Sequence, residues 1–213
     1  MLKFRVLGRI LDTGLIAVIR AGNSGEAIRI AEACAEGGAT VVEVTFTIPG
    51  AADVIQRLSE RSADSSLIVG AGTVLDPETA RLAILSGAQF VVSPAMNAET
   101  ARLCNRYQIP YLPGAGTVRE IIEAMESGAD IVKVFPGETT GPAFVKAVKA
   151  ALPHAALMPT GGVSLENVRS WIESGCVAVG VGGNLTRTAA QGDFRSISDL
   201  TRQFIQEIRR VRT

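Results

Sequence analysis

The stretch Asp130-Ile131-Val132-Lys133-Val134-Phe135-Pro136, which follows Ser127-Gly128-Ala129, decides how the chain is organised. Glycine commonly ends a helix, and the short run of β-branched residues after it predicts a strand. Apart from Lys133, the run is apolar on both faces, which is typical of parallel strands covered on both sides. The stretch therefore predicts a helix end followed at once by a buried parallel strand.

The same pattern recurs along the chain about every 20–26 residues, which is the size of one strand-helix unit. Helix starts are marked between the runs, by Asp76-Pro77-Glu78 and by the capping box Thr117–Glu120. The predicted strands are Ile16–Arg20, Ala39–Phe46, Ser66–Thr73, Phe90–Ala95, Tyr111–Gly116, Asp130–Pro136, Ala156–Gly162 and Ala178–Gly183.

Eight strand-helix units without a linker predict an α/β fold, a (β/α)8 TIM barrel that forms a single domain over residues 1–213. Leu2–Thr13 is expected to be an extra N-terminal helix, and Asp193–Val211 the last helix. A doubly wound open sheet is the alternative. It is disfavoured because Leu75 stands where the third glycine of a dinucleotide-binding motif would follow Gly70-Ala71-Gly72.

Composition excludes several classes of protein. The chain has 213 residues, of which 47% are hydrophobic, and 21 basic residues balance 21 acidic ones. The hydrophobic fraction excludes a disordered chain, and the neutral charge argues against a nucleic-acid partner. The single histidine, His154, precedes a predicted strand and is expected on the face opposite the site. Metal sites rich in histidine and most hydrolase triads are therefore excluded, and no metal or other cofactor is expected.

Cysteine usage and the N-terminal residues indicate the compartment. Cys34, Cys104 and Cys176 are odd in number and far apart, which favours reduced thiols over a disulfide framework. Lys3 and Arg5 interrupt the first apolar residues, so no signal peptide is predicted, and no run is long enough to span a bilayer. A cytoplasmic location without a membrane partner is expected.

Two charged residues interrupt predicted strands, Glu43 and Lys133. Such side chains are rarely buried without a partner or a purpose. Burial lowers the pKa of a lysine and raises that of a glutamate. A neutral lysine is a nucleophile toward carbonyls, and a glutamate with a raised pKa accepts and returns protons. The alternative is a purely structural ion pair inside the barrel.

Glycine-rich turns end the last two predicted strands. Thr160-Gly161-Gly162 follows the seventh and Gly182-Gly183-Asn184 the eighth. Barrels often bind a phosphate group between these two turns, because glycine lets the backbone approach closely. The expected ligand therefore carries a phosphate and a carbonyl group.

Further candidates lie at strand ends. Arg20 is expected either to bind a carboxylate or to be a solvated rim charge, and Thr73 either to contribute a hydroxyl or to form a turn. Pro94 and Phe135 are expected to shape an apolar wall. Acidic residues in helical segments are expected on solvated faces.

Together these motifs resemble the class I aldolases for 2-dehydro-3-deoxy-6-phosphogluconate (KDPG) and 4-hydroxy-2-oxoglutarate (KHG), along essentially the whole chain. The motifs are Val42–Thr45, Gly70–Val74, Val92–Pro94, Val132–Pro136, Pro159–Gly162 and Gly182-Gly183. The resemblance implies a metal-free homotrimeric (β/α)8 enzyme of carbohydrate metabolism, in the Entner–Doudoroff pathway.

Position by position, Lys133 matches the family's Schiff-base lysine and Glu43 its general acid and base. Thr73 and Phe135 match pocket positions. The residues that match the phosphate site and its surroundings are Thr160, Gly161, Gly162, Gly182, Gly183 and Asn184, and well-known members carry serine in place of Asn184.

One position departs from well-known members. They place an arginine that helps to hold the carboxylate four residues after the catalytic glutamate, where this chain has Thr47, although some members share this version. We hypothesise that Arg20 and Thr73 hold the carboxylate instead.

The resemblance implies cleavage of KDPG to pyruvate and glyceraldehyde 3-phosphate, and of KHG to pyruvate and glyoxylate. Three alternatives remain. They are an aldolase for 2-dehydro-3-deoxy-6-phosphogalactonate, another phosphosugar enzyme such as an epimerase or a thiamine-phosphate-synthase-like transferase, and a barrel that only binds a phosphorylated metabolite. An epimerase would need metal-binding histidines, which the chain lacks. The transferase would need acidic ligands for a diphosphate–Mg²⁺ complex, and the sequence does not indicate such ligands.

Overall fold

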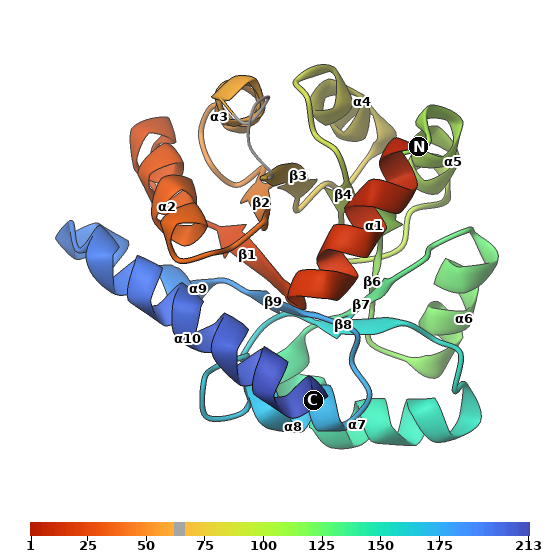
Figure 1. The fold of residues 1–213 in the computed structure, drawn as a ribbon. Coiled ribbons are helices and arrows are strands. Elements are labelled where there is room, and N and C mark those ends of the chain that lie inside the picture. The colour runs from red at the N-terminus through yellow and green to blue at the C-terminus, as the bar shows by residue number, and fades with distance from the viewer. Residues whose placement is uncertain (62–66) are drawn as a thin grey trace.

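The computed structural model describes residues 1–61 and 67–213 as an α/β fold of parallel strands with helices on their outer side (Figure 1). Ser66, the predicted start of the third strand, lies outside the described residues. The strands are β1 (Leu15–Ile19), β2 (Val41–Thr45), β3 (Ile68–Gly72), β4 (Val91–Val92), β5 (Tyr111–Leu112), β6 (Gly114–Ala115), β7 (Val132–Val134), β8 (Leu157–Pro159) and β9 (Val179–Val181).

The helices alternate with the strands as the sequence predicts. They are α1 (Leu2–Thr13), α2 (Ser24–Glu36), α3 (Ala51–Arg61), α4 (Pro77–Leu85), α5 (Ala98–Tyr107), α6 (Val118–Glu126), α7 (Gly137–Ala151), α8 (Val168–Glu173), α9 (Gly183–Thr186) and α10 (Phe194–Arg212), with a short 3₁₀ turn over Ala189–Gln191. None of the helices in the described part of the chain combines the length and apolar character needed to cross a membrane.

All strand pairs are parallel. One sheet has the order β5-β4-β3-β2-β1-β9 and the other the order β6-β7-β8. At the boundary between β8 and β9, Thr160 forms a parallel bridge with Gly180, and the Val177 N–H donates to the Leu157 carbonyl over 2.9 Å.

The predicted fifth strand, Tyr111–Gly116, is divided into β5 and β6 at Pro113. Proline has no N–H to donate to a neighbouring strand, so it interrupts the ladder at this point. Its carbonyl still accepts from the Lys133 N–H over 2.9 Å. The fourth strand is also shorter than predicted, because only Val91 and Val92 pair as strand residues.

The predicted helix ends are confirmed. Asp76 accepts from the Thr79 N–H over 2.6 Å at the start of α4, and Thr117 accepts from the Glu120 N–H at the start of α6. The Glu120 carboxylate also accepts from the Gly116 N–H over 2.8 Å. At the other ends, Gly128 has a φ of 91° and Gly175 a φ of 101°, a left-handed conformation that glycine adopts readily.

Helix α1 covers the amino ends of the strands. Val6 and Ile10 of α1 are fully buried in a cluster with side chains from the strands, and Figure 1 shows α1 across this end. The other members of this cluster are Ile16, Val41, Ile68, Phe90, Val92, Leu112, Ile131, Met158 and Ala178. A larger cluster packs the outer faces of the strands against the surrounding helices. Because α1 covers the amino ends, access to the interior is left to the carboxyl ends.

Candidate active site

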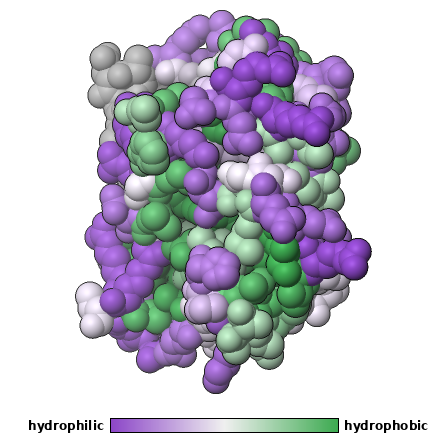
Figure 2. Space-filling model, turned by 90° about the vertical axis from the view of Figure 1, so that its right-hand side faces the viewer, coloured by the Kyte–Doolittle hydropathy of each residue, from purple (hydrophilic) through white to green (hydrophobic). Residues whose placement is uncertain are grey.

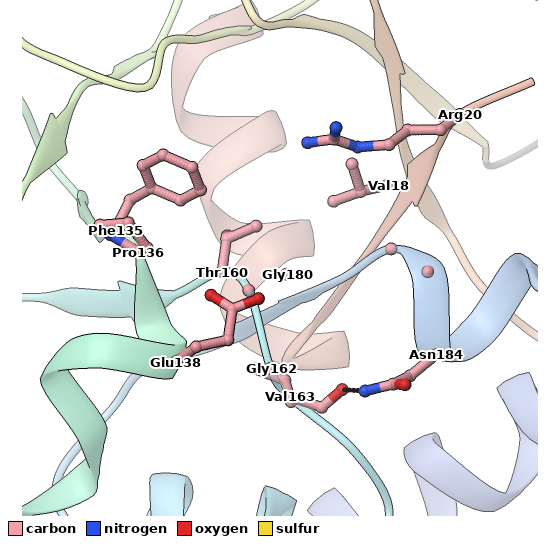
Figure 3. A pocket seen from close by; sticks show the side chains of 13 residues that line it. Val18, Arg20, Phe135, Pro136, Glu138, Thr160, Gly162, Val163, Gly180 and Asn184 are labelled. Atoms are coloured by element: carbon pink, nitrogen blue, oxygen red, sulfur yellow. Dashed lines mark hydrogen bonds between the residues drawn. The ribbon is translucent and has the colours of Figure 1, made fainter.

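A cavity of about 560 Å³ opens at the carboxyl ends of β1, β7, β8 and β9 (Figure 3). It lies at the end of the strands where parallel barrels place their active sites. It is lined by Val18, Arg20, Phe135, Pro136, Glu138, Thr160, Gly161, Gly162, Val163, Gly180, Gly182, Gly183 and Asn184. Eight of these were predicted site residues: Arg20, Phe135, Thr160, Gly161, Gly162, Gly182, Gly183 and Asn184.

The two glycine-rich turns face the same cavity. Gly161 and Gly162 have φ values of 97° and 67°, and their amides donate to no acceptor within the described residues. Asn184, in the other turn, donates from Nδ2 to the Val163 carbonyl over 2.9 Å, as the dashed line in Figure 3 marks. This bond ties the turn after β9 to the turn after β8, so both present backbone to one space.

Glu43 and Lys133 project from β2 and β7 and are almost completely buried, at 1% and 4% exposure. Burial raises the pKa of the Glu43 carboxyl, while the charges of Lys133 and Arg20 oppose the rise. Burial also lowers the pKa of the Lys133 amine, which Glu43 opposes and Arg20 reinforces. Each group is thereby shifted toward its neutral form, as nucleophilic and proton-transfer groups require.

The predicted alternative, a structural ion pair, is not found: Lys133 and Glu43 form no direct ion pair among the described residues. Both carboxylate oxygens of Glu43 are buried and have no hydrogen-bond partner. Leaving a buried polar group unpaired costs about 1–3 kcal/mol. A structural role would not justify this cost, so the arrangement favours a role in binding or chemistry.

Phe135 and Arg20 connect this buried pair to the cavity. Lys133 and Glu43 do not line the cavity themselves. The Lys133 Nζ lies 4.8 Å from the centroid of the Phe135 ring, which forms part of the cavity wall. Arg20 also lines the cavity, and its charge acts on both Lys133 and Glu43. The amine therefore lies close to an aromatic side chain of the cavity wall.

Thr160 adds an unpaired hydroxyl to the cavity wall. Its side chain is 5% exposed, and its Oγ1 has no hydrogen-bond partner. The absence of a side chain at Gly180, on the adjoining strand, leaves room for this hydroxyl, because a Cβ there would lie 2.3 Å from Oγ1. A buried hydroxyl with unused hydrogen-bonding capacity is suited to a ligand group.

Besides Lys133 and Glu43, three predicted site residues do not line this cavity: Thr47, Thr73 and Pro94. Thr47 is exposed, and its hydroxyl is hydrogen-bonded to that of Thr45 over 2.8 Å. Thr73 is half-buried and has a φ of 57°, which is unusual for a β-branched residue. His154 is exposed in the turn before β8, on the opposite face, as predicted.

Five residues of the cavity wall are not among the predicted site residues: Val18, Pro136, Glu138, Val163 and Gly180. Acidic residues of helices are expected to face solvent, and Glu138 is indeed exposed, but it also lines the cavity. Its position in the sequence could have indicated this place, because Glu138 follows the predicted strand Asp130–Pro136 by only two residues and so lies at the carboxyl end of that strand. Within the described residues, no group of three or more His, Cys, Asp or Glu side chains is placed to hold a metal ion.

Comparison with known proteins relates the chain to one family. Residues 7–200 match the family described as KDPG and KHG aldolase. The 2-dehydro-3-deoxy-6-phosphogalactonate aldolase of Escherichia coli K12 is 36% identical over 81% of this chain and 84% of its own. The 2-dehydro-3-deoxy-phosphogluconate aldolase of Haemophilus influenzae is 37% identical over 79% of each chain.

Solved structures give the same result. A solved structure described as native KDPGal superposes with a TM-score of 0.86 at 32% identity, covering 92% of this chain and 95% of that one. KDPG aldolase from Legionella pneumophila, captured with pyruvate as a covalent carbinolamine intermediate, has a TM-score of 0.82 at 27% identity and covers 91% and 95%.

Proposed function

Because the chain belongs to the KDPG and KHG aldolase family, we propose that it is a metal-independent class I aldolase, a carbon–carbon lyase. Its substrate is KDPG, which it cleaves to pyruvate and glyceraldehyde 3-phosphate, and KHG is a second substrate that gives pyruvate and glyoxylate. The observation that carries the proposal is the burial of the Lys133 amine and the Glu43 carboxylate close to one cavity without a mutual ion pair.

Imine formation begins with attack by the neutral Lys133 amine on the C2 ketone of the substrate. The shift of the Lys133 pKa toward lower values increases the fraction of amine able to attack. Glu43, whose pKa is raised by burial, gives a proton to the carbinolamine hydroxyl. Water then leaves, and a protonated imine links Lys133 to C2.

The protonated imine accepts the electrons of the bond that breaks. The Glu43 carboxylate takes the proton of the C4 hydroxyl, C4 becomes an aldehyde, and the C3–C4 bonding pair moves through C2 to the nitrogen to give an enamine. The aldehyde leaves, C3 of the enamine takes a proton, and water hydrolyses the imine to pyruvate and free Lys133. Without the imine, the electron pair would remain on an unstabilised carbanion.

Arg20 and Thr73 hold the substrate carboxylate, since Thr47 replaces the arginine of well-known members. The position of the Arg20 side chain over the cavity in Figure 3 supports this role for Arg20. Thr47 and Pro94 do not line the cavity, and they stay predicted substrate-binding positions. Phe135 packs against the imine region, because its ring lies beside the Lys133 Nζ.

The phosphate is bound by the two glycine turns. Gly161 and Gly162 offer amides without internal acceptors, and Gly182, Gly183 and Asn184 face them across the cavity. Backbone N–H groups at such turns are common phosphate ligands. The bond from Asn184 to Val163 holds the two turns together.

The strands close into a complete (β/α)8 barrel, and the chain is one domain over residues 1–213. The Thr160–Gly180 bridge supports closure between β8 and β9. Closure on the other side is supported by β5 and β6, which only Pro113 separates. Because β5 pairs with β4 and β6 pairs with β7, the two form one interrupted strand that joins the two sheets.

The enzyme is a homotrimer in the cytoplasm. Exposed apolar side chains support assembly; they include Leu82 and Leu85 of α4, Tyr107 of α5, and Val118 and Ile122 of α6. Figure 2 shows hydrophobic residues grouped on the face at the right of Figure 1, where α5 and α6 run. Sedimentation of the wild type tests the trimer, and a monomer would contradict it.

Borohydride trapping tests the aldolase. We expect wild-type protein incubated with pyruvate and borohydride to gain the mass of a reduced pyruvate adduct, and Lys133→Ala to gain none. Lys146→Ala removes an exposed lysine of α7 and is the matched control, which should be trapped like the wild type. The absence of an adduct on the wild type would overturn the proposal and favour a barrel that only binds a metabolite.

A second candidate is cleavage of 2-dehydro-3-deoxy-6-phosphogalactonate, which differs from KDPG in stereochemistry. The identity of 36% with the Escherichia coli enzyme of that name favours it. Comparing kcat/KM for the two purified sugar acids decides between the candidates, because both share the imine chemistry.

A further inference from the structure

We infer that Thr45 is a positioning residue that directs Arg20 toward the carboxylate of a 2-ketoacid. It acts through a chain of two hydroxyl groups, its own and that of Thr47, which holds the backbone just before Arg20. The inference rests on the proposed aldolase function and concerns how the ketoacid end of the substrate is bound. Thr45 does not line the cavity itself, so its effect on the substrate passes through Arg20.

Thr45 lies beside the end of β1. It is the last residue of β2, and its side chain is completely buried. The two strands are neighbours (Figure 1) and pair in parallel, with Ile19 opposite Val44. Arg20, the first residue after β1, therefore leaves the sheet within reach of the residues that end β2.

The hydroxyl chain has a single possible direction. The Thr45 Oγ1 donates to the Ile19 carbonyl over 2.9 Å, and this bond is buried. A carbonyl only accepts, and a hydroxyl group has one proton to give. In the 2.8 Å bond between Thr45 and Thr47, the donor must therefore be Thr47. The chain runs from Thr47 through Thr45 to the Ile19 carbonyl, and it uses both protons.

This direction decides what Thr47 can offer to a substrate. Its proton is used within the chain, so its oxygen is left as an acceptor only. A carboxylate is also an acceptor only, and the two do not form a hydrogen bond. Thr47, which stands where well-known members carry an arginine, thus supports carboxylate binding from a distance, by completing the chain behind Thr45.

The Ile19 carbonyl belongs to the peptide group that leads into Arg20. Because a peptide group is planar, a hydrogen bond that fixes this carbonyl also fixes the direction in which the backbone enters Arg20. The Arg20 side chain itself forms no hydrogen bond or ion pair with another described residue. Its backbone is therefore the part of Arg20 that the hydroxyl chain holds.

A fixed backbone helps Arg20 to bind an anion. Figure 3 shows the Arg20 side chain extending over the cavity. A long side chain loses conformational freedom when it binds a ligand, and a backbone that already has the right direction reduces this loss. Removal of the Thr45 hydroxyl should therefore weaken binding of a ketoacid carboxylate without changing the chemistry at Lys133.

The test measures the pyruvate concentration that gives half-maximal borohydride trapping on Lys133. Thr45→Val keeps the shape of the side chain and removes its hydroxyl. We expect this concentration to rise about fivefold, as for the loss of one hydrogen bond, and trapping at saturating pyruvate to stay at the wild-type yield. Thr45→Ser restores the hydroxyl and should return the concentration close to the wild-type value.

Arg20→Ala separates positioning from a general loss of structure. If Thr45 acts through Arg20, Thr45→Val should have no further effect on half-saturation in the Arg20→Ala background, because the effects of coupled residues do not add. Thr47→Val, at an exposed position, gives the same test if Thr45→Val does not fold: it should weaken binding in the wild-type background and not in Arg20→Ala.

Thr201→Val is the matched control. It also removes a buried threonine hydroxyl that donates to a carbonyl, that of Ile197 over 2.7 Å, but it lies in α10, outside the cavity. Its half-saturation should equal that of the wild type. Wild-type half-saturation in Thr45→Val, or an equal rise with and without Arg20, would overturn this inference alone. If the wild type traps no pyruvate at all, the proposed function fails and the inference fails with it.

Discussion

The carboxylate of Glu43 occupies the space that a side chain at position 72 would need. A Cβ built on Gly72 would lie 1.8 Å from Glu43 Oε1, 2.4 Å from its Cδ and 2.5 Å from its Cγ. The two residues lie on neighbouring strands, β2 and β3, and Gly72 pairs with Thr45. The absence of a side chain at Gly72 therefore leaves the space in which the carboxylate of Glu43, the proposed general acid and base, lies.

Gly72→Ala is expected to lower kcat for aldol cleavage about 100-fold, because a displacement of about 1 Å at a reacting group has effects of this size. Steady-state cleavage assays with KDPG provide the measurement. Gly8→Ala is the control, since a Cβ at Gly8, on α1, meets nothing within 4 Å. Wild-type kcat in Gly72→Ala would show that the position of Glu43 does not limit the reaction.

The raised pKa of Glu43 makes a prediction for stability. Between its ordinary value of 4.5 and the higher folded-state pKa, the folded chain binds more protons than the unfolded chain. The stability contributed by Glu43 is therefore complete below pH 4.5 and is lost as the pH rises through the folded-state pKa. Because glutamine does not ionise, Glu43→Gln should gain free energy of unfolding relative to the wild type as the pH rises from 4.5 toward neutrality.

Urea unfolding at a series of pH values measures this difference. Glu120→Gln is the control of opposite sign, because hydrogen bonds from Gly116 and Thr117 lower the pKa of Glu120 below 4.5. Its stabilising effect is present above pH 4.5 and is lost in acid, so Glu120→Gln should lose stability relative to the wild type as the pH rises. If the free energy of unfolding depends on pH in the same way in the wild type and in Glu43→Gln, the pKa of Glu43 is not raised in the folded protein.

Arg20→Ala should raise KM for pyruvate and for the ketoacid substrates about 10- to 100-fold, because it removes a charged hydrogen-bond donor from the carboxylate. Arg20→Lys should restore part of the affinity, since it keeps the charge but not the two-pronged geometry. Initial rates over a range of substrate concentrations give KM. An unchanged KM in Arg20→Ala would disprove the assignment of the carboxylate to Arg20.

Asn184→Ala removes the 2.9 Å hydrogen bond to Val163 that joins the two glycine turns. We expect KM for the phosphorylated substrate to rise about fivefold, the equivalent of roughly 1 kcal/mol for one hydrogen bond. KM for the unphosphorylated analogue should not change. Equal effects on both substrates would place Asn184 outside the phosphate site.

Periodic features of the sequence predicted most of the fold. Helix α1 has the predicted bounds, and all eight predicted strand runs contain strand residues in the structure. Strand ends were less predictable, because hydrogen bonding along the ladder decides where a strand stops. Pro113 divides the fifth run, since it cannot donate to the neighbouring strand.

The site could be predicted where a residue broke a pattern. Lys133 and Glu43 could be predicted because a charged side chain inside an apolar strand is rarely buried without a partner or a function. Glu138 did not stand out, because a glutamate in the first turn of a helix is common and favourable there. Its place in the cavity depends on the distance between α7 and the turn at Gly161, which is a tertiary contact that local patterns do not encode.

The burial of Lys133 and Glu43 without a direct partner has an evolutionary consequence. Apolar residues at these two positions would remove the cost of desolvation, so selection for heat resistance alone would discard both groups. Their retention depends on continued selection for turnover. In a duplicated copy relieved of that selection, positions 43 and 133 are where we expect apolar residues to accumulate first.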